Sequence, residues 1–362
     1  MIYLDYQATT PLAPEALDAM LPWLRDQHAN PHSSHAPGRA AKAAVEVARA
    51  QVAALLPPGG RVVFTSGATE ALNWAIKGTT GGIVTIATEH AAVLDTVEAE
   101  GRAGRAVAML PVGGDGLVDM DAARAAISPG VGLVAAMLVN NEIGVIQPIA
   151  ALAAHAHSAG ALMLCDAVQG YGRVPIPEGC DLIALSAHKI HGPKGIGALW
   201  IRDGVTLAPL LHGGNQEGGR SGTLSPALCA GFGRAAALMA ARQSEDAAYA
   251  ARLWKLAIDR FGAGWTINGA IDHRYRGNLN IRRDGLDVAR LMSDCRDIAF
   301  SAGSACASGS GRSSHVLRAL GLTEAQARSS IRIGFGRYTH EDDLITAIDR
   351  ITAAADVQQV LA

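Results

Sequence analysis

One stretch of sequence decides the fold class: Asp181-Leu182-Ile183-Ala184-Leu185-Ser186, followed by Ala187-His188-Lys189-Ile190-His191-Gly192-Pro193. A short, almost uninterrupted apolar run of this kind is typical of a strand that is covered on both faces, as in a parallel sheet between helices. Further runs of this type lie at 61–65, 82–87, 132–139 and 161–165, with helical patterns such as 149–158 between them. The first two-thirds of the chain therefore predicts an α/β fold with a mainly parallel sheet covered by helices.

The pattern changes after about residue 227. An alanine-rich stretch at 227–256 predicts one long or broken helix, and short strands such as 277–282, a Gly/Ser-rich loop at 301–314 and a closing helix follow it. This order is typical of a smaller α+β domain, and a length of 362 residues favours two or three domains. We expect a large α/β domain over 13–245 and a small α+β domain formed by 1–12 and 246–362.

Composition excludes several classes of protein. Hydrophobic residues make up 49% of the chain and charged residues 18%, which excludes a disordered chain, and a net charge of −2 without a basic block predicts no nucleic-acid partner. The five cysteines are odd in number and form no Cys-x-x-Cys pair, so a reducing compartment is expected. We see no signal peptide, no membrane span and no metal motif around His28, His32 and His35, and we expect a cytoplasmic protein.

Three local features carry candidate chemistry. Ser66-Gly67-Ala68-Thr69 lies between a strand and a helix, where backbone N–H groups can hold a phosphate, although this stretch taken alone favours a plain helix N-cap. Asp166 ends an apolar strand and faces the usual ligand crevice of an α/β sheet, or it caps a helix. Lys189 is one of only five lysines and follows the next strand, where it can form a Schiff base, or it is a surface lysine.

Together these features match the needs of pyridoxal 5'-phosphate. A lysine forms the imine, a carboxylate keeps the pyridine nitrogen protonated, and a phosphate cradle anchors the cofactor.

At this point the sequence resembles the cysteine desulfurases of the NifS/IscS type, within the class V aminotransferase family. The resemblance covers nearly the whole chain, and its motifs are specific by their joint order and spacing. They lie at 3–11, 65–70, 88–95, 139–144, 166–169, 186–197, 220–223, 304–306 and 329–332. The resemblance implies aminotransferase fold type I, with a seven-stranded, mainly parallel sheet in the large domain.

The resemblance also implies residue roles. Lys189 would bind the cofactor covalently, Asp166 would pair with its pyridinium nitrogen, Gln169 would donate to its phenolic oxygen, and His90 would stack on its ring and assist proton transfer. The phosphate would be held by Ala68, Thr69, Ser186 and His188, joined by Thr223 from a second subunit of a homodimer. The substrate carboxylate would be bound by Asn141 and Arg332, because the arginine fork matches a carboxylate.

Cys306 decides the reaction class. It lies among small residues in the 301–311 loop, which favours a loop able to carry a thiol into and out of a site. The resemblance implies that Cys306 takes the sulfur of L-cysteine as a persulfide, leaves L-alanine, and passes the sulfur to an acceptor protein for iron–sulfur clusters, another sulfur-containing cofactor or tRNA.

Three alternatives remain open from the sequence. Two are enzymes of the same fold, a selenocysteine lyase and a class V aminotransferase, and the third is a non-catalytic binding module. Loss of the lysine or of the acid would mark a non-catalytic member, and both are present. The 212–220 stretch is about one residue shorter than is usual and lacks an arginine after its Gln-Glu pair, which affects the predicted dimer-contact loop.

Overall fold

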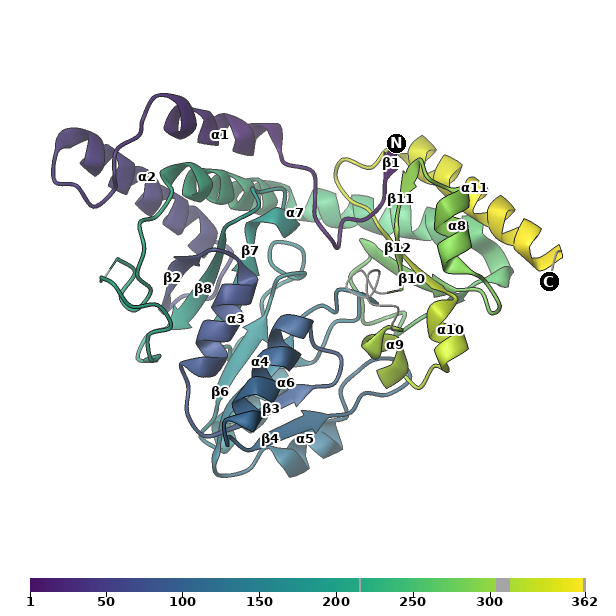
Figure 1. Cartoon of the computed structure of the whole chain (residues 1–362), viewed down its shortest axis with the longest axis horizontal. Helices are drawn as coiled ribbons and strands as arrows, with labels where there is room; N and C mark the ends of the chain where they lie inside the picture. The colour runs from purple at the N-terminus through teal and green to yellow at the C-terminus, as the bar shows by residue number, and fades with distance from the viewer. Residues whose placement is uncertain (215, 304–312, 361–362) are drawn as a thin grey trace.

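The computed structural model describes residues 1–214, 216–303 and 313–360. Its main element is a seven-stranded sheet in the order β2-β8-β7-β6-β5-β3-β4 (Figure 1). The strands are β2 (Gly60–Thr65), β3 (Gly82–Ile86), β4 (Val107–Leu110), β5 (Val131–Met137), β6 (Leu162–Asp166), β7 (Leu182–Ser186) and β8 (Gly197–Arg202). Only β8 runs antiparallel to its neighbours, so the predicted mainly parallel sheet is confirmed.

Helices cover both faces of this sheet. Alternate strand residues point to opposite faces: Val62 and Phe64 pack on one side, and Val63 on the other. The first face is covered by α2 (Ala36–Ala53), α5 (Met120–Ala126), α6 (Ile149–Ser158) and the first half of α7 (Pro226–Phe261), and the second by α3 (Ala68–Lys77) and α4 (Ala91–Arg102). Burial on both faces explains the continuous apolar runs that predicted the strands.

A second, smaller sheet has the order β12-β13-β10-β9 and is antiparallel throughout. It is built from β9 (Thr266–Ile267), β10 (Asn278–Arg282), β12 (Ser301–Ala302) and β13 (Ser330–Gly334). It has its own apolar cluster, together with α8 (Val288–Asp294) and α11 (Glu341–Val360), while α9 (His315–Ala319) and α10 (Glu324–Arg328) lie beside it. This matches the predicted smaller α+β unit, whose boundaries at 12/13 and 245/246 stay a prediction.

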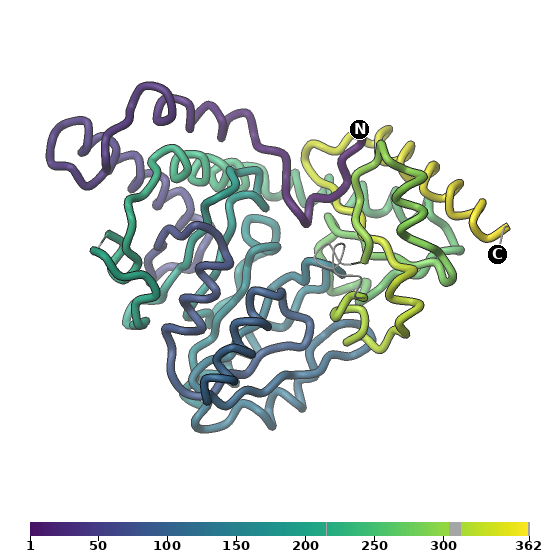
Figure 2. The backbone as a smooth tube through the Cα atoms, viewed as in Figure 1, coloured from purple at the N-terminus to yellow at the C-terminus, as the bar shows by residue number. Residues whose placement is uncertain are grey.

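The two apolar clusters are linked by α7 and by the N-terminal segment. The helix α7 is unbroken over 226–261, and Phe232 packs in the first cluster while Leu253 packs in the second. The chain begins in β1 (Ile2–Tyr3), paired in parallel with β11 (Ile298–Ala299), and then crosses to α1 (Pro14–Arg25), as Figure 2 shows. This crossing brings residues 5–10 into the space between the two sheets.

Within the described ranges, no helix is long and apolar enough to cross a bilayer. The cysteines described there, at 165, 180, 229 and 295, are all buried free thiols. The expectation that Cys165 and Cys229 are packed core residues is confirmed.

Candidate active site

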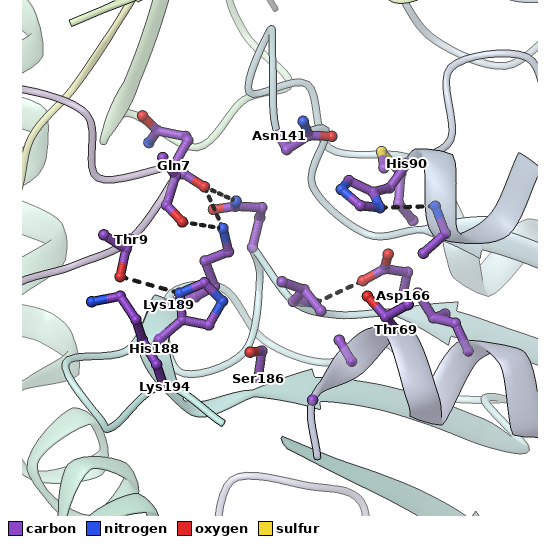
Figure 3. Close-up of a pocket in the computed structure, with 18 of the residues that line it drawn as sticks. Gln7, Thr9, Thr69, His90, Asn141, Asp166, Ser186, His188, Lys189 and Lys194 are labelled. Atoms are coloured by element: carbon purple, nitrogen blue, oxygen red, sulfur yellow. Dashed lines mark hydrogen bonds between the residues drawn. The ribbon is translucent and has the colours of Figure 1, made fainter. Parts of the chain in front are cut away.

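A cavity of about 570 Å³ lies at the carboxyl ends of the parallel strands β5, β6 and β7. This edge is where α/β sheets usually bind ligands. Ten of the predicted site residues line it: Ala68, Thr69, His90, Asn141, Asp166, Gln169, Ser186, His188, Lys189 and Arg332. In Figure 3, Lys189 and His188 lie on one side of the cavity, and His90, Asp166 and Thr69 lie on the other.

Lys189 ends the short 3-10 turn at Ala187–Lys189, directly after β7. Its Nζ donates to the backbone oxygens of Gln7 at 2.6 Å and Ala8 at 2.7 Å. Burial and then the positive charges of Arg332 and Arg173 lower the pKa of Lys189 to about 8. The interpretation of Lys189 as a surface lysine is therefore wrong, because its side chain lines the cavity and its amine is held there by two backbone carbonyls.

Asp166 is the last residue of β6 and is buried at the far side of the cavity. Its Oδ1 accepts from the backbone N–H of Val168 at 3.0 Å. Residues 167–173 form turns and no helix, so Asp166 is not a helix cap. Burial raises the pKa of Asp166, while the hydrogen bond from Val168 and the nearby His90 and Lys189 oppose this rise. A buried carboxylate in this position gains from a cationic partner.

His90 caps α4 and presents one ring nitrogen to the cavity. Its Nδ1 accepts from the backbone N–H of Ala92 at 3.0 Å, so the ring proton of the neutral form belongs on Nε2. Burial lowers the pKa of His90. A neutral, flat ring with a donor at Nε2 suits stacking on a cofactor and proton transfer. This favours the predicted role of His90 over the alternative, a packed core histidine.

The end of the cavity beside α3 has unfilled hydrogen-bond donors. The N-cap of α3 is Gly67, and no side chain caps its first turn, so the backbone N–H groups around Ala68 and Thr69 are available to an anion. The stretch is a helix start with Gly67 as its N-cap, as the helix-cap interpretation has it, but no side chain occupies the donors of its first turn. Ser186 and His188 also line the cavity.

His188 lies on the lysine side of the cavity. Its Nδ1 is 3.1 Å from Thr9 Oγ1. Burial and the charge of Lys189 lower the pKa of His188 to about 4, so this ring is neutral at pH 7.

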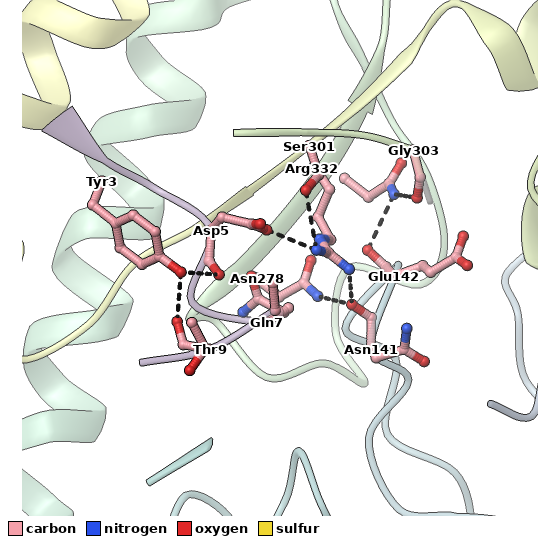
Figure 4. Close-up of polar contacts among 12 residues, drawn as sticks. Tyr3, Asp5, Gln7, Thr9, Asn141, Glu142, Asn278, Ser301, Gly303 and Arg332 are labelled. Carbon is pink, nitrogen blue, oxygen red and sulfur yellow. Dashed lines mark hydrogen bonds and ion pairs between the residues drawn. The ribbon is translucent and has the colours of Figure 1, made fainter. Parts of the chain in front are cut away.

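Arg332 enters the cavity from β13 and is almost fully buried. Its Nη2 donates to Asp5 Oδ1 at 2.7 Å and to Ser301 Oγ at 3.3 Å, and its Nη1 donates to the backbone oxygen of Asn141 at 3.1 Å (Figure 4). Its Nε is buried without a partner. The side chain of Asn141 also lines the cavity, so a cation and an amide converge there, as a carboxylate site requires.

Two predicted residues are not brought to the cavity in the single chain. Thr223 is exposed and does not line it, although Arg220, nearby in the chain, pairs with Glu70 of α3 at 2.7 Å. Cys306 lies outside the described residues.

Sequence reasoning assigned no role to several residues of the site. Asp5 and Gln7 belong to the matching 3–11 motif, but nothing local indicates that they contact Arg332 and Lys189. Lys194 lines the cavity, and Arg173 holds Gln169 from behind it. The one sequence signal for a role of Arg173 in the site is its position four residues after Gln169.

Comparisons with known proteins agree with this geometry. A family model described as Aminotransferase class-V matches residues 2–346. The chain is 41% identical to "Cysteine desulfurase IscS" of Rickettsia bellii, over 97% of this chain and 90% of that protein. It is 45% identical to "Cysteine desulfurase, mitochondrial" of Saccharomyces cerevisiae, over 95% of this chain and 72% of that protein. The solved NifS-like protein of Rickettsia africae superposes with a TM-score of 0.91 at 30% identity, over 98% of this chain and 99% of that one.

Proposed function

Because the chain belongs to the class V aminotransferase family and, within it, to the cysteine desulfurases, we propose that its cavity binds pyridoxal phosphate on Lys189 and that Cys306 receives the sulfur of L-cysteine. The observation that carries the proposal is that Lys189 and Asp166 lie on opposite sides of one cavity, and that the start of α3, which no side chain caps, also lines it. Lys189 would be the attachment point, Asp166 the partner of the pyridinium nitrogen, and the start of α3 the phosphate cradle.

The residues present fit this cofactor. Burial raises the pKa of the Asp166 carboxylate, and a protonated ring nitrogen would give this carboxylate a directly contacting cationic partner. The first turn of α3 offers its N–H groups to a phosphate beside Ser186. The volume of about 570 Å³ falls within the usual range for a cofactor site.

When bound, pyridoxal phosphate takes up the electron pair of a bond broken next to the amino-bearing carbon of the substrate. The chain supplies the rest. Arg332 and Asn141 bind the substrate carboxylate, which fixes the orientation of that carbon. Lys189, whose pKa burial and neighbouring positive charges lower to about 8 in the cofactor-free chain, would act as a base and move a proton at its Nζ. His90 offers a proton at Nε2 on the other wall.

The described residues on either side of Cys306 support its role. Cys306 follows Gly303 by three residues in the sequence, and three residues of chain span at most roughly 10 Å. The backbone oxygen of Gly303 accepts from Asn280 Nδ2 at 3.3 Å, and Ser301, two residues earlier, contacts Arg332. At the other end of the segment, Ser314 Oγ donates to the carboxylate of Glu142, next to Asn141. Both ends of the cysteine-bearing segment are thus held beside the substrate site.

The sulfur transfer balances without a further reactant. The Cys306 thiolate attacks the substrate sulfur, an S–S bond forms, and the C–S bond breaks with its electron pair passing to the carbon, which is protonated. The net change is L-cysteine plus the Cys306 thiol giving L-alanine plus the Cys306 persulfide. A thiol acceptor then takes the outer sulfur, and we propose a sulfur-acceptor protein in that role.

A homodimer and a cytoplasmic location complete the proposal. Thr223 sits on a surface loop that the Arg220–Glu70 ion pair fixes to α3, which supports a role at the phosphate end of a second copy's cavity. The free thiols of the described cysteines support a reducing compartment. The alternatives, a selenocysteine lyase and a class V aminotransferase, are less favoured because both compared relatives are named cysteine desulfurases.

Borohydride reduction tests the cofactor attachment directly, because two lysines line the cavity. The holoenzyme is reduced, digested and analysed by mass spectrometry, beside Lys189→Ala and Lys194→Ala variants. We expect the cofactor on the peptide that carries Lys189 in the parent protein and in Lys194→Ala, and no adduct in Lys189→Ala. An adduct on Lys194, or none in the parent protein, would overturn the proposal.

A further inference from the structure

Arg173 lies just outside the cavity and donates hydrogen bonds to two of the residues that line it. Its Nη1 donates to Gln169 Oε1 at 2.9 Å, and its Nη2 donates to the backbone oxygen of Lys189. The guanidinium lies 5.1 Å from the ring centre of Tyr275, an arrangement that fixes its plane. Among the described residues Arg173 forms no ion pair with a carboxylate, so its charge is left to act on its neighbours.

These contacts determine which way the Gln169 amide points. A guanidinium has only donors, so the atom that faces Arg173 must be the amide oxygen. The other end of the amide donates to the backbone oxygen of Gln7 at 2.9 Å, and a carbonyl can only accept. Both partners therefore select the same orientation, with the NH₂ group on the cavity side. That group has two hydrogens, and the bond to Gln7 uses one of them.

The charge of Arg173 acts on the Lys189 amine. Burial lowers the pKa of Lys189 first, then the positive charges of Arg332 and Arg173 lower it further, while Asp5 and Asp166 raise it. Burial lowers the pKa values of the neighbouring rings His90 and His188, so these rings add little positive charge of their own beside Lys189. Arg332 lines the cavity and Arg173 does not. The charge of Arg173 therefore acts on the Lys189 amine without contact between Arg173 and a ligand in the cavity.

We propose that Arg173 is a positioning residue of this active site, which turns the donor end of Gln169 toward the cofactor and holds Lys189 in its reactive place and charge state. The inference rests on the proposed function, because it assigns Gln169 an acceptor oxygen on the bound cofactor. It makes two separable claims. The first claim is that the planar guanidinium of Arg173 fixes the orientation of the Gln169 amide. The second is that its positive charge favours the neutral form of the Lys189 amine.

Two substitutions separate the claims. Arg173→Lys keeps the charge but loses the fork that reaches Gln169 and Lys189 together. Arg173→Met loses both. The matched control is Arg283→Met, because Arg283 also lies over an aromatic ring, Trp265, but its side chain binds Asp356 and Gln359 and contacts neither Gln169 nor Lys189. Each variant is introduced into the parent sequence and studied as the holoenzyme. Arg173→Lys is also combined with Gln169→Ala.

The readouts are the dissociation constant of pyridoxal phosphate and the pH at which the absorbance of the bound cofactor changes. We expect Arg173→Lys to raise the dissociation constant about tenfold, the effect of one hydrogen bond to a charged group. In the Gln169→Ala background the same change should alter it less than about twofold, because the amide is already gone. Arg173→Met should also raise the pH midpoint by roughly 0.5 to 1 unit, while Arg173→Lys leaves it in place.

Full additivity of Arg173→Lys with Gln169→Ala would overturn the positioning claim. An unchanged pH midpoint in Arg173→Met, or the same shift in Arg283→Met, would overturn the charge claim. Either result leaves the proposed function intact as long as the parent protein binds the cofactor on Lys189. If the parent protein binds no pyridoxal phosphate, the proposed function itself has failed, and the test reports this before any variant is compared.

Discussion

The Asp5 carboxylate lies 2.7 Å from Arg332 Nη2, although 327 positions separate the two residues in the chain. Asp5 follows the first strand, and Arg332 belongs to β13 of the small sheet. A buried guanidinium without a counter-ion is costly, so Asp5 both balances the charge of Arg332 and fixes its plane. The N-terminal segment is therefore part of the proposed substrate site.

This relationship predicts the effect of Arg332→Lys. The lysine keeps the positive charge but loses the fork that holds Asp5, Ser301 and the substrate carboxylate together. We expect KM for L-cysteine to rise about 10- to 100-fold, because a charge-assisted hydrogen bond contributes about 1.5–3 kcal/mol. Steady-state kinetics with alanine as the measured product checks this. An unchanged KM would remove Arg332 from the substrate site.

A second prediction concerns the pH dependence of Lys189. With a pKa of about 8, its amine is half neutral at that pH and mostly neutral above it in the cofactor-free protein, and the neutral form reacts with amine reagents. Asp5 raises this pKa, so Asp5→Asn should move the midpoint to lower pH. The measurement is the rate of labelling of the Lys189 peptide against pH, by mass spectrometry. A midpoint near the ordinary lysine value of 10.5, or an upward shift in Asp5→Asn, would contradict the account.

Asp166→Asn should separate stability from activity. Burial raises the pKa of Asp166, so its ionised form destabilises the cofactor-free fold, and this penalty disappears as the pH falls below the folded-state pKa. We expect the variant to lose desulfuration yet to melt at a higher temperature than the cofactor-free parent at pH 7. The stabilisation should shrink in acid.

The matched control for this experiment is Asp246→Asn. Asp246 is ion-paired with the buried Arg337, so its neutralisation should lower the melting temperature instead. Thermal unfolding of both cofactor-free variants between pH 4 and 8 provides the comparison. Destabilisation by Asp166→Asn at pH 7 would show that the carboxylate has a favourable partner in the free protein.

Gly197→Ala tests the phosphate cradle through packing. A Cβ at Gly197 would lie 2.5 Å from the backbone oxygen of Leu185 and 2.6 Å from the backbone carbon of Gly67, so the start of α3 must move. We expect a loss of stability of about 1–3 kcal/mol together with weaker cofactor binding. Gly264→Ala, which would place its Cβ in open space, should change neither. Tight cofactor binding by Gly197→Ala would argue against a cradle at Gly67.

Much of this fold could be predicted from local sequence. The buried strands of the large sheet gave apolar runs because both of their faces are covered, and Lys189 and Asp166 could be located because they follow such runs. Strand direction could not be predicted, since periodicity is the same for either direction, and β8 is antiparallel. Neither β8 nor the edge strand β4 was among the predicted strands, and β4 was missed because Val107 and Met109 face solvent and break the apolar run.

The long-range contacts of the site could not be predicted from the sequence, for a different reason. Lys189 is held by carbonyls 181 and 182 positions away, and backbone carbonyls leave no trace in the identity of a residue. The pairing of Asp5 with Arg332 depends on the crossing of the N-terminal segment, which only the packed structure defines. Motif resemblance located the residues, while their partners required the fold.

The central claim is that Cys306 takes the substrate sulfur, and a single-turnover reaction without reductant tests it most directly. The holoenzyme is mixed with L-cysteine, alanine is quantified, and every cysteine peptide is examined by mass spectrometry for one added sulfur. The account predicts one alanine per active site and a persulfide on Cys306 alone, with neither product in Cys306→Ala. Alanine formation at the parent rate in Cys306→Ala, or a persulfide on Cys165, Cys180, Cys229 or Cys295 instead, would contradict it.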